Sequence, residues 1–461
     1  MYPRPLFQNK ALQDQLTEPA AQHECKVNHP ALPSFQQRII LHVDLNCFYA
    51  QAECFRRPEL RDKPVVVGGD EEARHGIVLA KNMIAKGFGI KTGEALWQAR
   101  QKCPGLVSVR ADYRHYQRIA QAARAIYYDY SDRVEPFGLD ECWIDVTGSA
   151  ELFGGGQRAG RFIAEEISER SKSELGMSVS VGVSWNKVFA KFGSDYKKPD
   201  GITHITPDNY QDLVWAAPAS ELLYIGPATT RKLADAGIFS IGDVAGASAK
   251  LMRGKLGKIG AMLQVFARGE DASLVRVMDQ DKRDVSYGIK SIGNSMTAPH
   301  DLRGEADVKA LVYLLSESVA QRLRESRLKA QTITAYIRHA DLHSYHRQKQ
   351  LLLPSFLTGE IAAAAYDIVC ENEDLSRETS FRSLGVRASN LISMWDPTQT
   401  NLFVAEPARI AYEDLEFSID DLRRRYGNKV VMRGCELHSS RMSRKDIKAD
   451  NTIHPVGFLR S

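Results

Sequence analysis

Three acidic residues, Asp44, Asp140 and Glu141, have the types and setting that metal-assisted phosphate chemistry needs. Asp44 ends a mostly apolar run at residues 38–44, and the other two lie in a turn between two apolar segments. Carboxylates held close together repel unless a cation binds them, and oxygen donors favour Mg²⁺ over zinc. Two such ions can activate an attacking oxygen and stabilise a departing pyrophosphate. On pattern alone, surface turn carboxylates or helix caps explain the three residues equally well.

Strands are expected to hold these carboxylates in place. Residues 134–137 and 142–146 flank the turn at 138–141, so a two-stranded hairpin would present both of its acidic residues at one tip. Periodicity predicts further strands at 38–44, 63–67, 77–80 and 179–183, and helices at 116–130 and 157–174. This mixture indicates an α+β sheet layer covered by helices.

The composition is that of an ordinary globular chain, with 461 residues, 43% hydrophobic and 26% charged. A net charge of +4 permits an acidic partner such as nucleic acid without requiring one. The seven cysteines form no C-x-x-C pair, which argues against a zinc site or disulfide framework and favours a reducing cytoplasm. No apolar run has membrane-spanning length, so we expect no membrane contact.

The pattern changes after residue 206, where short helices with glycine-containing turns are expected. Residues 276–290 are charged, as a solvated linker would be. A last α+β unit follows at 287–395, with a helix at 306–328, and the chain from 396 onward is polar.

Four blocks of this sequence resemble motifs of the Y family of DNA polymerases, in its polymerase IV branch. The first two are residues 43–50 and 138–146, which contain the three carboxylates. The third joins 186–191 to 198–202, and the fourth is 291–295. The resemblance implies an α+β multidomain fold, the right hand of palm, fingers, thumb and little finger.

The resemblance also implies where each domain lies. The expected divisions are a loosely ordered extension at 1–36, a palm at 37–47 and 112–205, fingers at 48–111, a thumb at 206–275, a linker at 276–286, a little finger at 287–395 and a C-terminal tail at 396–461.

Single residues take expected roles from the same resemblance. The implied ligands of two Mg²⁺ ions are Asp44, Asp140 and Glu141, with the main-chain carbonyl of Leu45. Tyr49 is the implied steric gate, whose ring leaves no room for a 2′-hydroxyl and so selects deoxynucleotides. Asn46 stands where many relatives have Asp, at a position that is not a main metal ligand in the family.

The nucleotide contacts implied by the resemblance involve Phe48, Lys86 and Lys198. Lys198 should reach the triphosphate, with a solvated turn charge as the alternative, and Phe48 serves mainly as packing support. The family's fingers motif usually carries Tyr and Arg where this chain has Met83 and Lys86. Methionine cannot donate a hydrogen bond to phosphate, and lysine lacks the bidentate fork of arginine. The grip on the triphosphate is therefore either weaker or shared with Lys81.

Contacts with primer–template DNA are expected from the thumb and the little finger. Gly226 lies in a segment that resembles a helix-hairpin-helix, whose backbone approaches a phosphate, although a plain αα-hairpin is the alternative. Lys290, Arg338, Arg347 and Lys349 are expected to line a sheet face that follows the DNA backbone, with an ordinary solvated face as the alternative.

A partner site is implied by Gln399, Leu402 and Phe403, which match the Gln-x-x-Leu-Phe peptide that docks on the bacterial sliding clamp. A flexible peptide can insert two apolar side chains into a pocket, and the partner then supplies processivity by tethering.

The expected function is error-prone, template-directed DNA synthesis past damaged bases from dNTPs, by a monomer in the cytoplasm. One alternative is a catalytically weak or silent relative that acts as a scaffold for DNA or partners, which Met83 favours and the intact carboxylates disfavour. A remote alternative is a diguanylate cyclase, because residues 68–71 resemble part of its Gly-Gly-Asp-Glu-Phe turn. Glu72, however, stands where the phenylalanine of that motif is expected.

Overall fold

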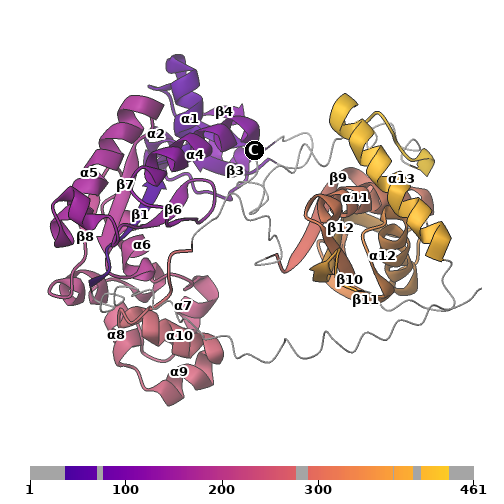
Figure 1. Cartoon of the computed structure of the whole chain (residues 1–461). Coiled ribbons are helices and arrows are strands. Elements are labelled where there is room, and N and C mark those ends of the chain that lie inside the picture. The colour runs from indigo at the N-terminus through magenta and orange to yellow at the C-terminus, as the bar shows by residue number, and fades with distance from the viewer. Residues whose placement is uncertain (1–36, 70–75, 277–288, 377, 398–405, 436–461) are drawn as a thin grey trace, which may run out of the picture.

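The computed structural model describes residues 37–69, 76–276, 289–376, 378–397 and 406–435. Figure 1 shows them as two bodies, one formed by residues 37–276 and the other by residues 289–435. The extension at 1–36, the clamp peptide and Asp70-Glu71 of the cyclase-like turn lie outside these ranges. Within the described ranges, no helix is long and apolar enough to cross a membrane.

A five-stranded sheet of order β5-β6-β1-β7-β8 forms the centre of the first body. Its elements are β1 (Ile40–Leu45), β5 (Val134–Pro136), β6 (Glu141–Asp145), β7 (Val179–Ser184), β8 (Ile202–His204), α4 (Tyr113–Tyr128), α5 (Gly156–Leu175) and α6 (Lys187–Tyr196). Leu41, Val43 and Leu45 of β1 enter the core that α4 and α5 close. His42 and Asp44 point the opposite way and contact α6.

Two local features set the position of α6 on this sheet. The Asn186 side chain caps the helix by accepting a hydrogen bond from Phe189 N at 2.8 Å. Gly182 of β7 lets the helix lie directly on the strand, because a Cβ there would come within 1.9 Å of Ala190 O. A larger residue at position 182 would push α6 away and displace Lys191, which faces the end of β1.

A three-stranded sheet and a group of short helices flank the five-stranded unit. The three-stranded unit contains β2 (Val65–Gly68), β3 (Val78–Lys81), β4 (Val107–Arg110), α1 (Phe48–Arg56), α2 (Met83–Gly87) and α3 (Leu96–Lys102), with strand order β3-β2-β4. The helical unit contains α7 (Pro227–Ala234), α8 (Ile241–Gly246), α9 (Ala249–Leu256) and α10 (Lys258–Ala267). Single 3₁₀ or π turns occupy Pro58–Leu60, Ala150–Phe153, Gln211–Trp215 and Ala219–Glu221.

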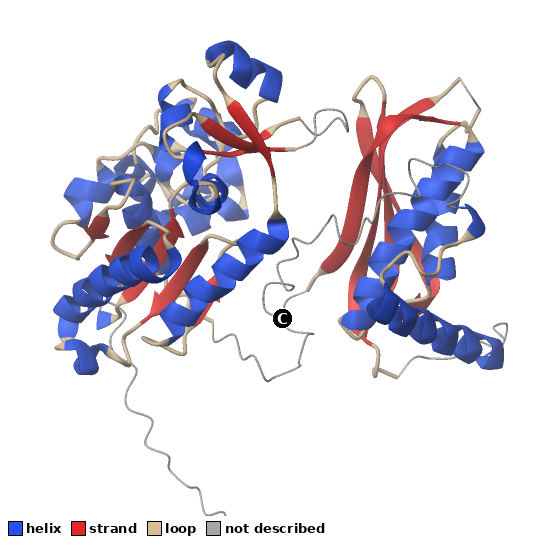
Figure 2. Cartoon of the chain, turned by 90° about the horizontal axis from the view of Figure 1, so that it is seen from above, coloured by secondary structure: helices blue, strands red, loops and turns tan. Residues whose placement is uncertain are grey.

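A four-stranded antiparallel sheet of order β11-β10-β12-β9 forms the second body. Its elements are β9 (Ser291–Arg303), β10 (Leu328–His339), β11 (Ser344–Ser355), β12 (Ser380–Ser393), α11 (Glu305–Glu325) and α12 (Thr358–Asn372). Figure 2 shows its helices gathered on one face of the sheet. Ile333, Ala335 and Ile337 of β10 enter the core beneath them, whereas Thr332 and Thr334 alternate onto the other face.

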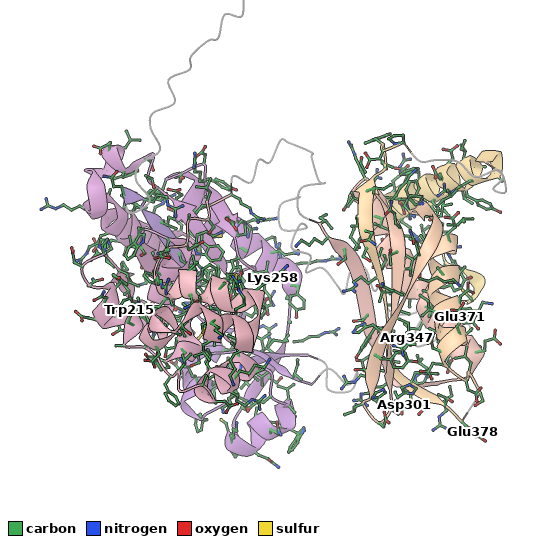
Figure 3. The ribbon with its side chains drawn as sticks, turned by 90° about the horizontal axis from the view of Figure 1, so that it is seen from below. Trp215, Lys258, Asp301, Arg347, Glu371 and Glu378 are labelled. Atoms are coloured by element: carbon green, nitrogen blue, oxygen red, sulfur yellow. The ribbon has the colours of Figure 1, made fainter. Side chains whose placement is uncertain are left out.

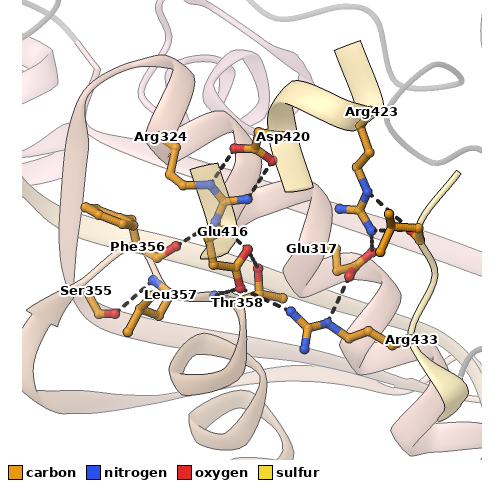
Figure 4. A network of polar contacts seen from close by, with 11 residues as sticks. Glu317, Arg324, Ser355, Phe356, Leu357, Thr358, Glu416, Asp420, Arg423 and Arg433 are labelled. Atoms are coloured by element: carbon orange, nitrogen blue, oxygen red, sulfur yellow. Dashed lines mark hydrogen bonds and ion pairs between the residues drawn. The ribbon is translucent and has the colours of Figure 1, made fainter. Parts of the chain in front are cut away.

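The polar chain after residue 396 contains a long helix that the sequence analysis did not predict, α13 (Glu406–Tyr426). It packs beside α11 and the start of α12 through ion pairs (Figure 4). Arg324 Nε lies 2.6 Å from Asp420 Oδ2, and Arg423 Nη2 lies 2.9 Å from Glu317 Oε2. Thr358 Oγ1, at the start of α12, donates a hydrogen bond to the buried Glu416 carboxylate of α13.

The pattern of α13 explains why hydrophobic periodicity did not reveal it. Its large apolar side chains Tyr412, Leu415, Leu422 and Tyr426 are exposed, and its charged side chains form the buried face. A search for apolar residues that face a core therefore finds the wrong side of this helix.

The other predicted elements are present, with ends shifted by a few residues. The helix expected at 116–130 is α4, and the one expected at 306–328 is α11. The hairpin around 138–141 is confirmed, except that Glu141 is the first residue of β6 rather than part of the turn. That difference matters because a strand fixes the side chain of Glu141 more firmly than a turn would.

Candidate active site

The sheet places Asp44 and Glu141 side by side. They are direct antiparallel partners in the β1–β6 ladder, so their side chains leave the sheet on the same face. Leu45 N donates to Asp140 O at 3.0 Å, which holds the hairpin tip against the end of β1. Asp44 and Glu141 thus lie side by side because their strands are neighbours, and the main-chain hydrogen bond from Leu45 holds Asp140 next to them.

Two lysines neutralise part of this cluster. Lys198 Nζ lies 2.6 Å from Asp44 Oδ2, and Lys191 Nζ lies 3.0 Å from Glu141 Oε1. Asp195 contacts both ammonium groups, at 3.1 Å from Lys191 and 2.7 Å from Lys198. Lys191 thus lies between two of the implied metal ligands, also 3.5 Å from Asp44 Oδ2, a position that the sequence pattern did not reveal.

The partly buried cluster carries more negative than positive charge. Its carboxylates are Asp44, Asp140, Glu141 and Asp195, and its ammonium groups are Lys191 and Lys198. Burial raises the pKa of Asp44 to about 7 against the opposing charge of Lys198, and burial together with the Glu141 charge raises the pKa of Asp140. A cation of higher charge would relieve this imbalance.

A divalent cation fits the chemistry of this donor set. Among the described residues, no three carboxylate, histidine or cysteine side chains lie close enough together to form a complete metal site. Instead, the ammonium group of Lys198 forms an ion pair with Asp44 Oδ2. Hard oxygen donors with excess negative charge suit Mg²⁺, which keeps several waters and takes few protein ligands. Asp44, Asp140 and Glu141 are the side chains that would hold it.

His42 is a buried neighbour of the cluster that the sequence analysis missed. Its Nε2 lies 3.3 Å from Glu141 Oε2, and its Nδ1 lies 2.8 Å from Ser194 Oγ on α6. Burial lowers the pKa of His42 to about 4, although the nearby Glu141 carboxylate acts in the opposite direction. The sequence did contain a signal for this position: His42 and Asp44 are two residues apart on a strand, so their side chains share a face.

Tyr49, the implied steric gate, belongs to an aromatic stack. Its ring is parallel to that of Tyr116 on α4, with centroids 4.4 Å apart and an interplanar angle of 11°. Tyr113 meets it edge-on at 5.9 Å. Tyr116 donates its hydroxyl to the fully buried Glu53 at 2.9 Å, which fixes the stack to α1. The supporting tyrosines lie far from Tyr49 in sequence, so the motif alone did not reveal them.

Phe48 is buried beside Tyr49, with ring centroids 5.4 Å apart, which fits packing support rather than a direct nucleotide contact. The Tyr49 ring therefore has neighbouring rings on more than one side.

Lysines from two units gather near the start of α1. Burial raises the pKa of the Cys47 thiol, and the positive charges of Lys86, Lys81 and Lys198 oppose that shift. Lys86 and Met83 are exposed on α2. Whether the grip on the triphosphate is weaker or shared with Lys81 stays a prediction.

The residues expected to contact DNA lie on exposed or open parts of their units. Gly226 precedes α7, and a Cβ there would meet nothing within 4 Å, so its backbone is open to approach. Lys290 is exposed just before β9. Arg338 lies on the face of β10 that the helices leave open, opposite Ser344 of β11.

Arg347 and Lys349 were expected on that same open face, and the register shows this to be wrong. They pair with Ala335 and Ile333, whose side chains enter the helix-covered core. Lys349 Nζ lies 2.9 Å from Glu371 of α12, and Figure 3 labels Arg347 on the sheet with Glu371 on its helical side. A one-residue error in register moves a whole strand face to the other side of a sheet.

The raised pKa values of Asp44 and Asp140 predict that Mg²⁺ stabilises the protein more at high pH. As the pH rises through these raised pKa values, the two carboxylates lose their protons and repel neighbouring negative charge, so the stability of the metal-free protein falls. Mg²⁺ then binds more tightly, because protons no longer compete for the carboxylates. We expect the Mg²⁺-induced increase in Tm to be larger at about pH 8 than at about pH 6. Thermal denaturation of the wild type and of Asp140→Asn checks this, and a variant with the same pH response as the wild type would contradict it.

Comparisons with known proteins agree with this geometry. Residues 43–195 match the impB/mucB/samB family, and residues 289–402 match the C-terminal domain of that family. The chain is 47% identical over 408 residues to a DNA polymerase IV of Acetivibrio thermocellus, a match that covers 88% of this chain and 100% of that one. It is 33% identical over 407 residues to a DNA polymerase IV of Clostridium acetobutylicum, covering 87% and 98%.

A solved structure shares the fold. The chain aligns with a Y-family DNA polymerase chimera of Dbh and Dpo4 at a TM-score of 0.66 and 22% identity, covering 77% of this chain and 99% of that one. This likeness shows the right-hand polymerase fold, in which a carboxylate-bearing sheet is accompanied by further units. The chain belongs to the Y family of DNA polymerases, in its DNA polymerase IV branch, and is a DNA-directed DNA polymerase.

Proposed function

We propose that this protein copies DNA past damaged template bases, with low fidelity, by transferring nucleotides from dNTPs to a primer 3′-hydroxyl. The observation that carries the proposal is the shared sheet face of Asp44 and Glu141, with Asp140 held beside them. The 47% identity to a DNA polymerase IV over most of the chain supports the choice of substrates.

We propose that the five-stranded unit is the palm and the three-stranded unit the fingers. The helical unit would be the thumb and the four-stranded unit the little finger. The expected boundaries at 48–111 and 206–275 agree with where the three-stranded and helical elements lie. Single-residue DNA contacts at Gly226, Lys290 and Arg338 are part of this proposal.

Two Mg²⁺ ions are the proposed cofactor, held by Asp44, Asp140, Glu141 and the Leu45 carbonyl. When bound, they neutralise the triphosphate and favour ionisation of the primer hydroxyl. Lys198, which forms an ion pair with Asp44 in this structure, is free to bind the triphosphate once another cation takes its place. The 3′ oxygen bonds to the α-phosphorus, the α–β bond breaks, pyrophosphate leaves, and the hydroxyl proton passes to water.

Primer extension tests the proposal directly. The full chain, with Mg²⁺ and all four dNTPs, should extend a primer on an undamaged template and across an abasic site. Extension without a template strand, or no extension on either substrate, would refute it. Incubation with GTP and no DNA tests the remote cyclase alternative, which a cyclic dinucleotide product would support.

Clamp binding is proposed for residues 399–403, which lie outside the described ranges. Replacing Leu402 and Phe403 with alanine should remove stimulation by a sliding clamp and leave clamp-free extension unchanged, because the peptide acts only as a tether. Primer extension with and without clamp measures both effects. Equal stimulation of the wild type and the double variant would exclude this peptide as the docking site.

We propose a monomer that works in the cytoplasm. The six cysteines in the described ranges are free thiols, which supports a reducing compartment.

A further inference from the structure

We infer that Asn46 is a positioning residue whose side-chain amide holds the Lys198 turn in place for the triphosphate. The inference rests on the proposed function, because it assumes that Lys198 binds the incoming nucleotide. Asn46 follows the catalytic Asp44 by two positions, and Asp200 follows Lys198 by two. One hydrogen bond between Asn46 and Asp200 therefore ties the two functional segments together.

The side chain of Asn46 is buried and uses both of its polar atoms. Its Nδ2 donates to Asp200 Oδ1 at 3.1 Å and lies 3.2 Å from Ser178 Oγ. Its Oδ1 accepts from Ser180 Oγ at 2.9 Å. The main-chain N–H of Asn46 donates to Ser178 O at 3.0 Å. Asn46 thus links the end of β1 to β7 on one side and to the Lys198–Asp200 turn on the other.

The turn that Asn46 holds has little freedom of its own. Asp200 has φ of +62°, in the left-handed region, which a non-glycine residue adopts at a cost. At Gly201 a Cβ would come within 2.0 Å of Lys197 O, so the chain doubles back tightly there. A hydrogen bond from outside the turn stabilises this conformation. Loss of that bond is expected to shift Lys198, whose Nζ now lies 2.6 Å from Asp44 Oδ2.

The chemistry of the contact requires an amide opposite a carboxylate. A carboxylate at position 46 could still accept from Ser180, but it has no hydrogen to donate to Asp200. Two carboxylates would then face each other beside a site that already carries excess negative charge. Combining Asn46→Asp with Asp200→Asn moves the amide to position 200 and the carboxylate to position 46, which restores a donor–acceptor pair of the same size.

Gln51 provides a matched control. Its Nε2 donates to Ser178 Oγ at 3.1 Å and its Oε1 accepts from Ser178 N at 3.2 Å, so it shares a neighbour with Asn46. Gln51→Glu makes the same change from amide to carboxylate on the next helix without facing Asp200.

The experiment measures kcat and KM for dNTP in primer extension by the full chain, with Tm recorded for every variant. Lys198→Ala should raise KM roughly tenfold or more, as the loss of a charge-assisted hydrogen bond predicts. Asn46→Asp should raise KM about tenfold with a smaller change in kcat. Adding Asp200→Asn to Asn46→Asp should bring KM back to within about twofold of the wild type, and Gln51→Glu should stay within that range throughout.

A double-mutant cycle shows whether Asn46 acts through Lys198. In the Lys198→Ala background, Asn46→Asp should add almost nothing to KM, because the group that it positions is already absent. Full additivity, or no rescue by Asp200→Asn, overturns the inference even if the wild type is a polymerase. A wild type that does not extend primers, or a Lys198→Ala variant with unchanged KM, instead refutes the proposed role of the site and the inference with it.

Discussion

Replacing Asp140 with alanine should reduce primer extension by about 10³-fold or more, the scale expected when a group that stabilises transition-state charge is removed. The cluster contains four carboxylates and two ammonium groups, so the variant would lose half of the excess negative charge available to a divalent cation. The main-chain carbonyl of Asp140, not its side chain, accepts from Leu45 N, so the alanine variant keeps the bond that holds the hairpin tip. The loss should therefore appear in kcat without loss of folding.

A matched control lies on the neighbouring strand. Glu135 of β5 pairs with Lys187 Nζ at 2.8 Å, and this pair is separate from the catalytic cluster. Glu135→Ala should leave primer extension within a few-fold of the wild type while lowering Tm, because the largely buried Lys187 loses its carboxylate partner. Equal extension by the wild type and Asp140→Ala would favour the alternative of a catalytically silent scaffold.

Replacing Tyr49 with alanine should lower discrimination against ribonucleotides by about a hundredfold or more, because a steric wall against the 2′-hydroxyl is removed. The ring is held by a parallel stack on Tyr116 and an edge contact from Tyr113, so it cannot easily move aside in the wild type. The measured quantity is the ratio of kcat/KM for each dNTP to that for the matching rNTP.

The conservative variant separates the ring from its hydroxyl. Tyr49→Phe keeps the stacked ring and should keep discrimination close to that of the wild type. If Tyr49→Ala left the ratio unchanged, the gate assignment would be wrong, although the polymerase assignment would stand.

The sequence predicted those parts of the site that depend on neighbours within one strand or motif. Asp44 lies one residue before the end of the apolar strand β1, and Asp140 and Glu141 share a hairpin, so short-range pattern located all three. The helix boundaries that matter, such as the start of α6 at its Asn186 cap, also follow local rules.

The contacts that tune the site join residues far apart in the chain. His42 with Ser194, Asn46 with Asp200 and Tyr49 with Tyr116 are brought together by the packing of helices on the sheet. No local pattern specifies them. The misplaced face of Arg347 and Lys349 has a related cause, because pairing register depends on the whole sheet rather than on one strand.

The ionic docking of α13 implies that the C-terminal region and the little finger are constrained to evolve together. Arg324 is almost fully buried, and it is neutralised by Asp420 and Glu416 of the helix. A lineage that lost the helix would leave this guanidinium buried without its carboxylates, a change that costs about 3–5 kcal/mol. Relatives without an equivalent helix are therefore expected to carry an uncharged residue in place of Arg324, and homologue alignments would show the two features lost together.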